Sequence, residues 1–149
     1  MVNNNLFSNQ PLIAALLAGF LAQLIKFLLS YYRNHTWNWA LLLRTGGMPS
    51  SHSAMAAGVT HSLGLTTGFG SPMFALALVL AMVVIYDATG IRRQAGRHAV
   101  IINRMITDLA SGHPLKQELL FEVLGHTPME AFAGMIMGIL IAQIIFWLW

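Results

Sequence analysis

The sequence predicts an all-α integral membrane protein: a bundle of about four transmembrane helices with additional interfacial and amphipathic helices. Composition is the first observation behind this class, because 56% of the 149 residues are hydrophobic and only 9% are charged. Soluble domains usually carry about a quarter of charged residues. The second observation is that several apolar stretches approach the roughly 20 residues that a helix needs to cross a bilayer. The chain has no cysteine, which excludes disulfides and thiolate metal sites.

The 149 residues are expected to form a single membrane-embedded domain. The first and third apolar stretches are strongly hydrophobic, whereas the second is weaker and rich in Ala, Gly and Ser. The Gly and Pro residues of TTGFGSP turn the chain between the second and third stretches. The expected spans are residues 11–32, 51–67, 71–88 and 128–149.

Two further segments are too short or too polar to cross the membrane. Residues 36–44 are expected to lie at the interface, because Trp37 and Trp39 are typical of headgroup depth. Residues 90–125 are interpreted as an amphipathic helix that is broken at SGHP, residues 111–114.

Charge placement predicts the orientation of the bundle. All eight Lys and Arg residues lie between Lys26 and Lys116, and the two ends of the chain carry none. With four spans, residues 33–50 and 90–126 lie on one membrane face. The positive-inside rule predicts that this is the cytoplasmic face of a bacterial plasma membrane or of an organelle membrane. The basic residues are too sparse for a nucleic-acid partner, and membrane lipids or a phosphate suit them better.

Lys26 and Arg33 are the first candidate site residues. Lys26 lies within the first apolar stretch, where an ionisable side chain is costly and usually faces a cavity or a partner. The alternative is that its ammonium reaches the nearby interface. Arg33 follows two helical turns later and shares the helix face of Lys26. Two cations on one face favour binding of an anion.

The segment GGMPSSHSA, residues 46–54, interrupts the apolar sequence with polar side chains. Proline and serine are ordinary signals for the start of a helix, so capping alone explains Pro49 and one serine. The N–H groups of a helix start also bind anions, and Ser50 and Ser51 lie there. His52 in the first turn could protonate a departing oxygen. The segment is a helix cap, a part of an active site, or both.

A third cluster, YDATGIRRQAGRH at residues 86–98, follows the third apolar stretch. Arg92 and Arg93 are expected on the same membrane face as His52, and arginine suits bidentate binding of phosphate. The alternative is that the arginines are a topology signal paired with Asp87.

The last cluster, GHTPMEAFAGMIMG, opens the final stretch. Glu130 follows His126 by four residues, close enough for its carboxylate to hold the imidazole. Such a pair is what an activated nucleophile or general base needs. Gly134 and Gly138 form a GxxxG pattern for close helix packing.

Together these segments resemble the divergent branch of the type 2 phosphatidic acid phosphatase superfamily, which also contains the vanadium haloperoxidases. The first motif of the superfamily is Lys-x6-Arg-Pro, which Lys26-x6-Arg33 resembles, with Asn34 in the proline place. The second is Pro-Ser-Gly-His, and residues 49–52 are similar to it, with Ser51 in the glycine place. The resemblance covers nearly the whole chain.

The third motif, Ser-Arg-x5-His-x3-Asp, is split in this sequence. Arg92 or Arg93 supplies its arginine, and His126-x3-Glu130 supplies its histidine and acid about thirty residues later. His98 is a rival nucleophile, because Arg92-x5-His98 has the usual spacing. The acid place after His98 is occupied by Ile, however, so His126 is preferred.

The resemblance implies hydrolysis of a membrane lipid phosphate monoester through a phosphohistidine, without a metal or another cofactor. His126 would attack phosphorus, Glu130 would orient it and His52 would protonate the leaving alkoxide. The remaining expected site residues are the phosphate-binding Lys26, Arg33, Ser50, Ser51, Arg92 and Arg93, with Asp87 in support.

Phosphatidylglycerophosphate, phosphatidic acid and polyprenyl phosphate all fit as substrates at a cytoplasmic site. The alternative function is a catalytically degenerate membrane protein that binds anionic lipid headgroups or scaffolds a membrane complex. The sequence leaves open whether the chain forms homo-oligomers.

Overall fold

The computed structural model describes residues 6–37, 39, 46–110 and 125–149. In these residues every regular element is a helix, which confirms the all-α class. A short 3₁₀ helix, η1, precedes five α-helices. Their bounds are η1 (Leu6–Ser8), α1 (Gln10–Asn34), α2 (Ser51–Thr67), α3 (Pro72–Thr89), α4 (Ile91–Ala110) and α5 (Pro128–Leu148).

Four of the helices begin at a polar cap that the sequence supplies locally. The Asn9 side chain accepts a hydrogen bond from Leu12 N at 3.1 Å, and Ser71 does the same for Phe74 N at 3.1 Å. Ser50 caps α2 and Thr127 caps α5 in the same way. Such caps satisfy N–H groups that have no partner inside the helix. The start of each of these four helices is therefore determined locally, by the side chain of its capping residue.

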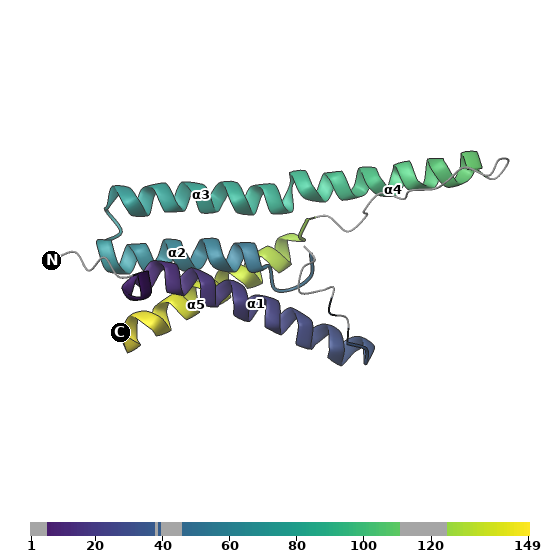
Figure 1. Ribbon diagram of the computed structural model, residues 1–149. Helices are drawn as coiled ribbons and strands as arrows, with labels where there is room; N and C mark the ends of the chain where they lie inside the picture. The colour runs from purple at the N-terminus through teal and green to yellow at the C-terminus, as the bar shows by residue number, and fades with distance from the viewer. Residues whose placement is uncertain (1–5, 38, 40–45, 111–124) are drawn as a thin grey trace.

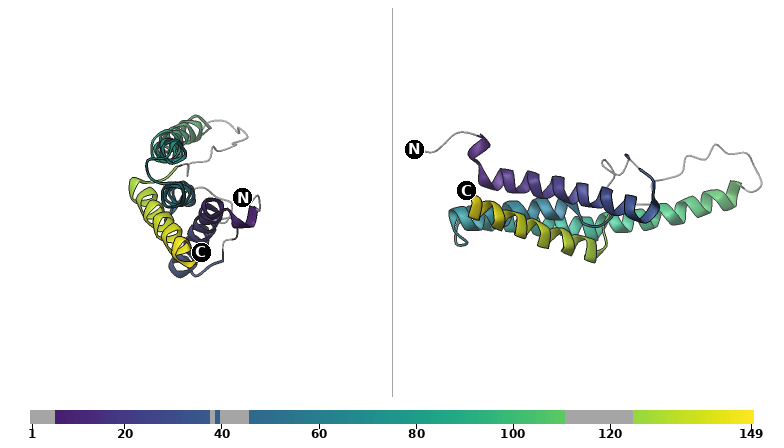
Figure 2. Two further views of the ribbon diagram at one scale, coloured as in Figure 1. Left: turned by 90° about the vertical axis from the view of Figure 1, so that its left-hand side faces the viewer. Right: turned by 90° about the horizontal axis from the view of Figure 1, so that it is seen from below.

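Helix α2 is the centre of the bundle and packs against α1, α3 and α5 (Figures 1 and 2). Its neighbours approach closely because the buried residues are small: Ala18 and Ala22 of α1 meet Ala54 of α2 with no exposed surface. Large apolar side chains instead point outward, as in Phe20 and Met82, which are more than 60% exposed. A core of small residues under an apolar surface is typical of helices packed in a bilayer.

Among the described residues, three helices are long and apolar enough to cross a membrane, and they overlap the predicted spans 11–32, 71–88 and 128–149. The second predicted span, α2, has only 17 residues, or about 26 Å of helix. Its start lies beside the second half of α1, and it runs back to the start of α3 (Figure 1). The start of α1 and the end of α5 therefore lie together at one end of the bundle. If α1 and α3 cross the membrane, α2 crosses back between them, and the four-span topology stays a prediction.

The interfacial and amphipathic segments are only partly within the described residues. The rings of Trp37 and Tyr31 stack 4.0 Å apart at the end of α1, which agrees with an aromatic group near the headgroups. Helix α4 continues the direction of α3 past the bundle (Figure 1). The expected break at residues 111–114 lies outside the described residues.

Candidate active site

The antiparallel course of the chain brings four sequence clusters to one end of the bundle. The second half of α1, the start of α2, the junction of α3 and α4 and the start of α5 all lie opposite the termini (Figures 1 and 2). These four segments carry the basic and histidine residues that the sequence singles out. The topology alone therefore gathers them on one membrane face.

His126 and Glu130 form the pair that their spacing predicts. The His126 Nδ1 atom lies 3.3 Å from Glu130 Oε2, and the imidazole is 4% exposed. The same carboxylate oxygen accepts a hydrogen bond from Thr127 N at 2.9 Å, which completes a capping box at the start of α5. A helix cap thus fixes the carboxylate that orients the imidazole. If Nδ1–H donates to Glu130, Nε2 carries the lone pair.

Two backbone hydrogen bonds tie this corner to the neighbouring helices. His126 N donates to Ala88 O at 2.8 Å, and Ser50 N donates to Glu130 O at 3.0 Å. Gly125 makes the first bond possible through a left-handed φ of +86°. A Cβ there would lie 2.5 Å from Arg93 N and 2.9 Å from Ala88 O. Only glycine lets the chain before α5 approach the α3–α4 junction this closely.

A cavity of about 130 Å³ opens beside His126. His52 from α2, Arg92 from α4 and Asp87 from α3 line it together with His126. Three separate helices and the segment just before α5 therefore contribute polar side chains to one small space. Since one water occupies about 30 Å³ of liquid, the cavity has room for a phosphate group.

Arg92 is already engaged at the rim of this cavity. Its Nε atom lies 2.6 Å from Asp87 Oδ2, and the two side chains are 51% and 33% exposed. Arg93 does not line the cavity. The structure thus distinguishes the two adjacent arginines, which the sequence leaves equivalent, and it pairs Asp87 with the arginine that lines the cavity.

Lys26 is buried in the same corner of the bundle but does not line the cavity. Its side chain is only 6% exposed, and its stem runs past Gly47, where a Cβ would lie 3.1 Å from Lys26 Cδ. The charge of Lys26 contributes to the lowered pKa of His126, so the ammonium acts within the same corner. This burial argues against an ammonium at the exposed interface, and phosphate binding by Lys26 stays a prediction.

The surroundings of His126 favour its neutral form. Burial lowers the pKa of His126 from its ordinary value, Glu130 partly opposes this, and His52 and Lys26 lower the pKa further. A buried imidazole is costly to charge without full compensation. Neutral imidazole is the form that has a lone pair to donate.

Comparison with known proteins identifies the family of the chain. A model of the Divergent PAP2 family matches residues 7–141. The chain belongs to the divergent PAP2 family. It is also 37% identical over 151 residues to the uncharacterized membrane protein YuiD of Bacillus subtilis (strain 168), with 94% of this chain and 96% of YuiD covered. No solved structure matches the chain.

Several residues that the divergent PAP2 resemblance singles out lie outside the cavity. Arg33 is exposed in the last turn of α1, and among the described residues no hydrogen bond or ion pair joins it to the cavity. Ser50 is fully buried and its hydroxyl caps α2, accepting from Ser53 N at 3.3 Å. Ser51 is half-buried in the first turn of α2. Phosphate contacts from these three residues stay predictions.

The rival histidine lies on α4, away from the cavity. His98 is exposed and does not line the cavity that contains His126 and Arg92. No group of three metal-ligating side chains occurs in the described part of the chain. The expectation of metal-independent chemistry stays a prediction.

The positioning role of Gly125 is not predicted from the sequence, whereas Gly134 and Gly138 are predicted to serve helix packing. That assignment is confirmed, since a Cβ at Gly134 would collide with Ser50 O and a Cβ at Gly138 with Ala54 O. Helix α5 therefore lies directly against the start of α2, which holds His126 near His52. The sequence feature that indicates this role of Gly125 is its position immediately before the candidate nucleophile, His126.

Proposed function

We propose that this divergent PAP2 protein hydrolyses a membrane lipid phosphate monoester through a phosphohistidine intermediate. The observation that carries the proposal is the shared cavity of His126, His52 and Arg92, with Glu130 bonded to the far nitrogen of the His126 ring. A buried neutral imidazole, a second histidine and a cation are the groups that phosphoryl transfer asks for.

The chemistry assigns one task to each group. The His126 Nε2 lone pair attacks phosphorus, and the bond from phosphorus to the ester oxygen breaks with its electron pair on oxygen. The protonated His52 donates its proton to that oxygen and becomes a neutral imidazole. A water then attacks the phosphohistidine, His52 takes the water's proton, and the bond from phosphorus to nitrogen breaks. Atoms and charges balance over the two steps.

Lys26 and Arg92 supply positive charge for the phosphate oxygens. Charge on the equatorial oxygens of a transferring phosphoryl group is stabilised by such fixed cations. Asp87 presents the guanidinium of Arg92 at the rim. Every Lys and Arg in the described residues lies at or beyond this end of the bundle, which supports a site facing the cytoplasm.

A second candidate function is binding of anionic lipid headgroups without turnover. The observation that favours it is the exposed position of Arg33, because one cation of the family pattern lies away from the cavity.

Phosphate release from the purified full chain separates these candidates. The panel is phosphatidylglycerophosphate, phosphatidic acid, polyprenyl phosphate and an activated aryl phosphate, assayed without added metal. Hydrolysis that His126→Ala abolishes and His98→Ala preserves supports the phosphatase. Lipid binding by the wild-type protein, with no phosphate release from any substrate of the panel, supports the headgroup-binding protein.

A further inference from the structure

We infer that the substrate carries a long hydrocarbon chain attached directly to its phosphate, as in an alkyl or polyprenyl phosphate, and that this chain lies in a groove between α1, α2 and α3. The inference rests on the proposed function and selects among its substrates. It disfavours glycerolipids, whose phosphate is separated from the acyl chains by a glycerol backbone and ester groups.

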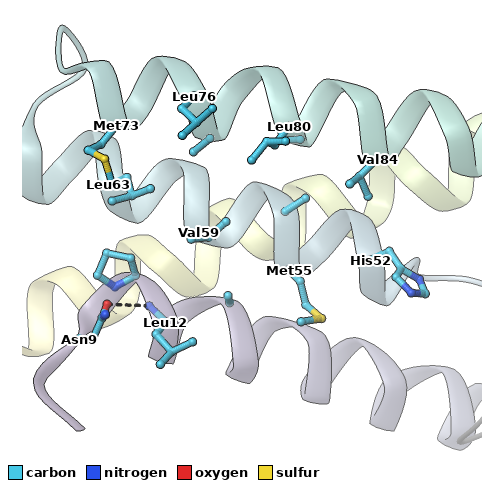
Figure 3. Close-up of a pocket in the computed structure, with 15 residues that line it drawn as sticks. Asn9, Leu12, His52, Met55, Val59, Leu63, Met73, Leu76, Leu80 and Val84 are labelled. Atoms are coloured by element: carbon cyan, nitrogen blue, oxygen red, sulfur yellow. Dashed lines mark hydrogen bonds between the residues drawn. The ribbon is translucent and has the colours of Figure 1, made fainter. Parts of the chain in front are cut away.

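The groove has a volume of about 630 Å³ and follows α2 from its first turn toward the α2–α3 turn. Figure 3 shows His52 at one end, and Leu63 and Met73 at the other, with Met55 and Val59 between them. Leu63 follows His52 by eleven positions in α2, which is about 17 Å along a helix. These dimensions suit one extended chain.

The groove is continuous with the candidate active site. His52 and Val84 line both the 630 Å³ groove and the 130 Å³ cavity that contains His126 and Arg92. A phosphate bound beside His126 would therefore present its ester oxygen to His52 with the next carbon at the head of the groove. This continuity is what identifies the occupant as the substrate's own chain rather than an unrelated molecule.

The lining of the groove opposes a polar linker. Among the described residues that line it, only Asn9 and His52 have polar side chains, and they lie at opposite ends (Figure 3). Asn9 is engaged with Leu12 N at 3.1 Å. Directly beyond His52 the lining is Met55, Ala56, Leu80 and Ala81. Ester carbonyls and a glycerol hydroxyl would be desolvated there without a hydrogen bond, which is costly, whereas a methylene chain would not.

The test compares kcat/KM of the full chain in mixed micelles for butyl phosphate, hexadecyl phosphate and a phosphatidic acid with two palmitoyl chains. We expect hexadecyl phosphate to exceed both of the others by about tenfold or more, as for substrates that differ in how they fill an apolar pocket. Phosphatidic acid hydrolysed as efficiently as hexadecyl phosphate would overturn the inference.

A variant pair locates the effect in the groove. Ala77→Phe fills the groove and should lower the ratio of hexadecyl to butyl phosphate kcat/KM by about tenfold. Ala133→Phe adds the same side chain to a different groove, between α1 and α5, and should leave that ratio unchanged. An equal effect of both variants would mean that the α1–α2–α3 groove holds bilayer lipid only. Ala56→Phe replaces Ala77→Phe if the latter fails to fold.

Failure of the proposed function has a different signature. If wild-type protein hydrolyses no ester, butyl phosphate included, catalysis is refuted. Binding of hexadecylphosphonate then tests whether the groove holds an alkyl chain. Thermal stabilisation by the phosphonate in wild type and Ala133→Phe, but not in Ala77→Phe, would still assign the chain to the groove. Identical stabilisation in all three proteins would overturn that assignment.

Discussion

Replacing Gly125 with alanine perturbs the active site through the backbone alone. Gly125 is not part of the reacting set, but its φ of +86° lets His126 N bond to Ala88 O. An added Cβ would lie 2.5 Å from Arg93 N and 2.9 Å from both Ala88 O and Arg92 C. These are backbone atoms of the α3–α4 junction, so the contact is relieved only when His126 and Arg92 move apart.

The two costs of this substitution have different consequences. The left-handed φ itself costs an L-residue about 1–3 kcal/mol and lowers stability. The collision displaces the nucleophile from the phosphate-binding side chain, and a misplacement of about 1 Å can lower a rate by about a hundredfold. We therefore expect Gly125→Ala to lower kcat by about a hundredfold in the fraction that remains folded.

Two matched glycines separate strain from displacement. Gly68 has a similar φ of +92° but open space around its Cβ position, and Gly70 has open space without a left-handed φ. Gly68→Ala should lose stability like Gly125→Ala yet keep activity per folded molecule, and Gly70→Ala should change neither. Melting temperatures and phosphate release measure both properties. Full activity of folded Gly125→Ala would refute the positioning argument.

The remaining predictions concern charge and topology. Because burial lowers the pKa of His126 and Glu130 partly raises it, the acid limb of kcat/KM should lie below the ordinary imidazole value of about 6.5, and Glu130→Gln should move it to lower pH. A pH profile in which Glu130→Gln moves the limb upward would contradict this assignment. Asp87→Asn should change the free energy of unfolding by less than about 1 kcal/mol, since the ion pair with Arg92 is half-exposed. Arg92→Ala should abolish the thermal stabilisation of the protein by vanadate. If vanadate stabilises Arg92→Ala as much as wild type, Arg92 does not belong to the phosphate site. Single cysteines at Gly70 and His98 should react with an impermeant reagent from opposite faces of the membrane, and labelling from one face would exclude the four-span topology.

Local chemistry explains why much of this architecture is predictable from the sequence. Pro72 and Pro128 with their preceding Ser and Thr caps start α3 and α5 within a residue or two of expectation. The contact between His126 and Glu130 follows from four residues of spacing at a helix start. These features depend on neighbours in the sequence, so pattern and propensity determine them.

The rest depends on packing between helices that are distant in sequence. Whether Arg92 or Arg93 reaches the cavity is set by the turn at Gly90 between α3 and α4. Ser50 serves as a buried cap because α5 lies against it at Gly134. The groove beside His52 exists only where three helices meet. No local sequence pattern encodes such placements, so they cannot be predicted from the sequence alone.

The most direct test of the account is to locate phosphate on the protein during turnover. The full chain is mixed with a labelled phosphate ester, quenched under alkaline conditions that preserve phosphohistidine, and mapped by peptide mass spectrometry. The account predicts phosphate on His126 in wild type and in His98→Ala, and none in His126→Ala. Phosphate on His98, or turnover that persists in His126→Ala, would contradict it.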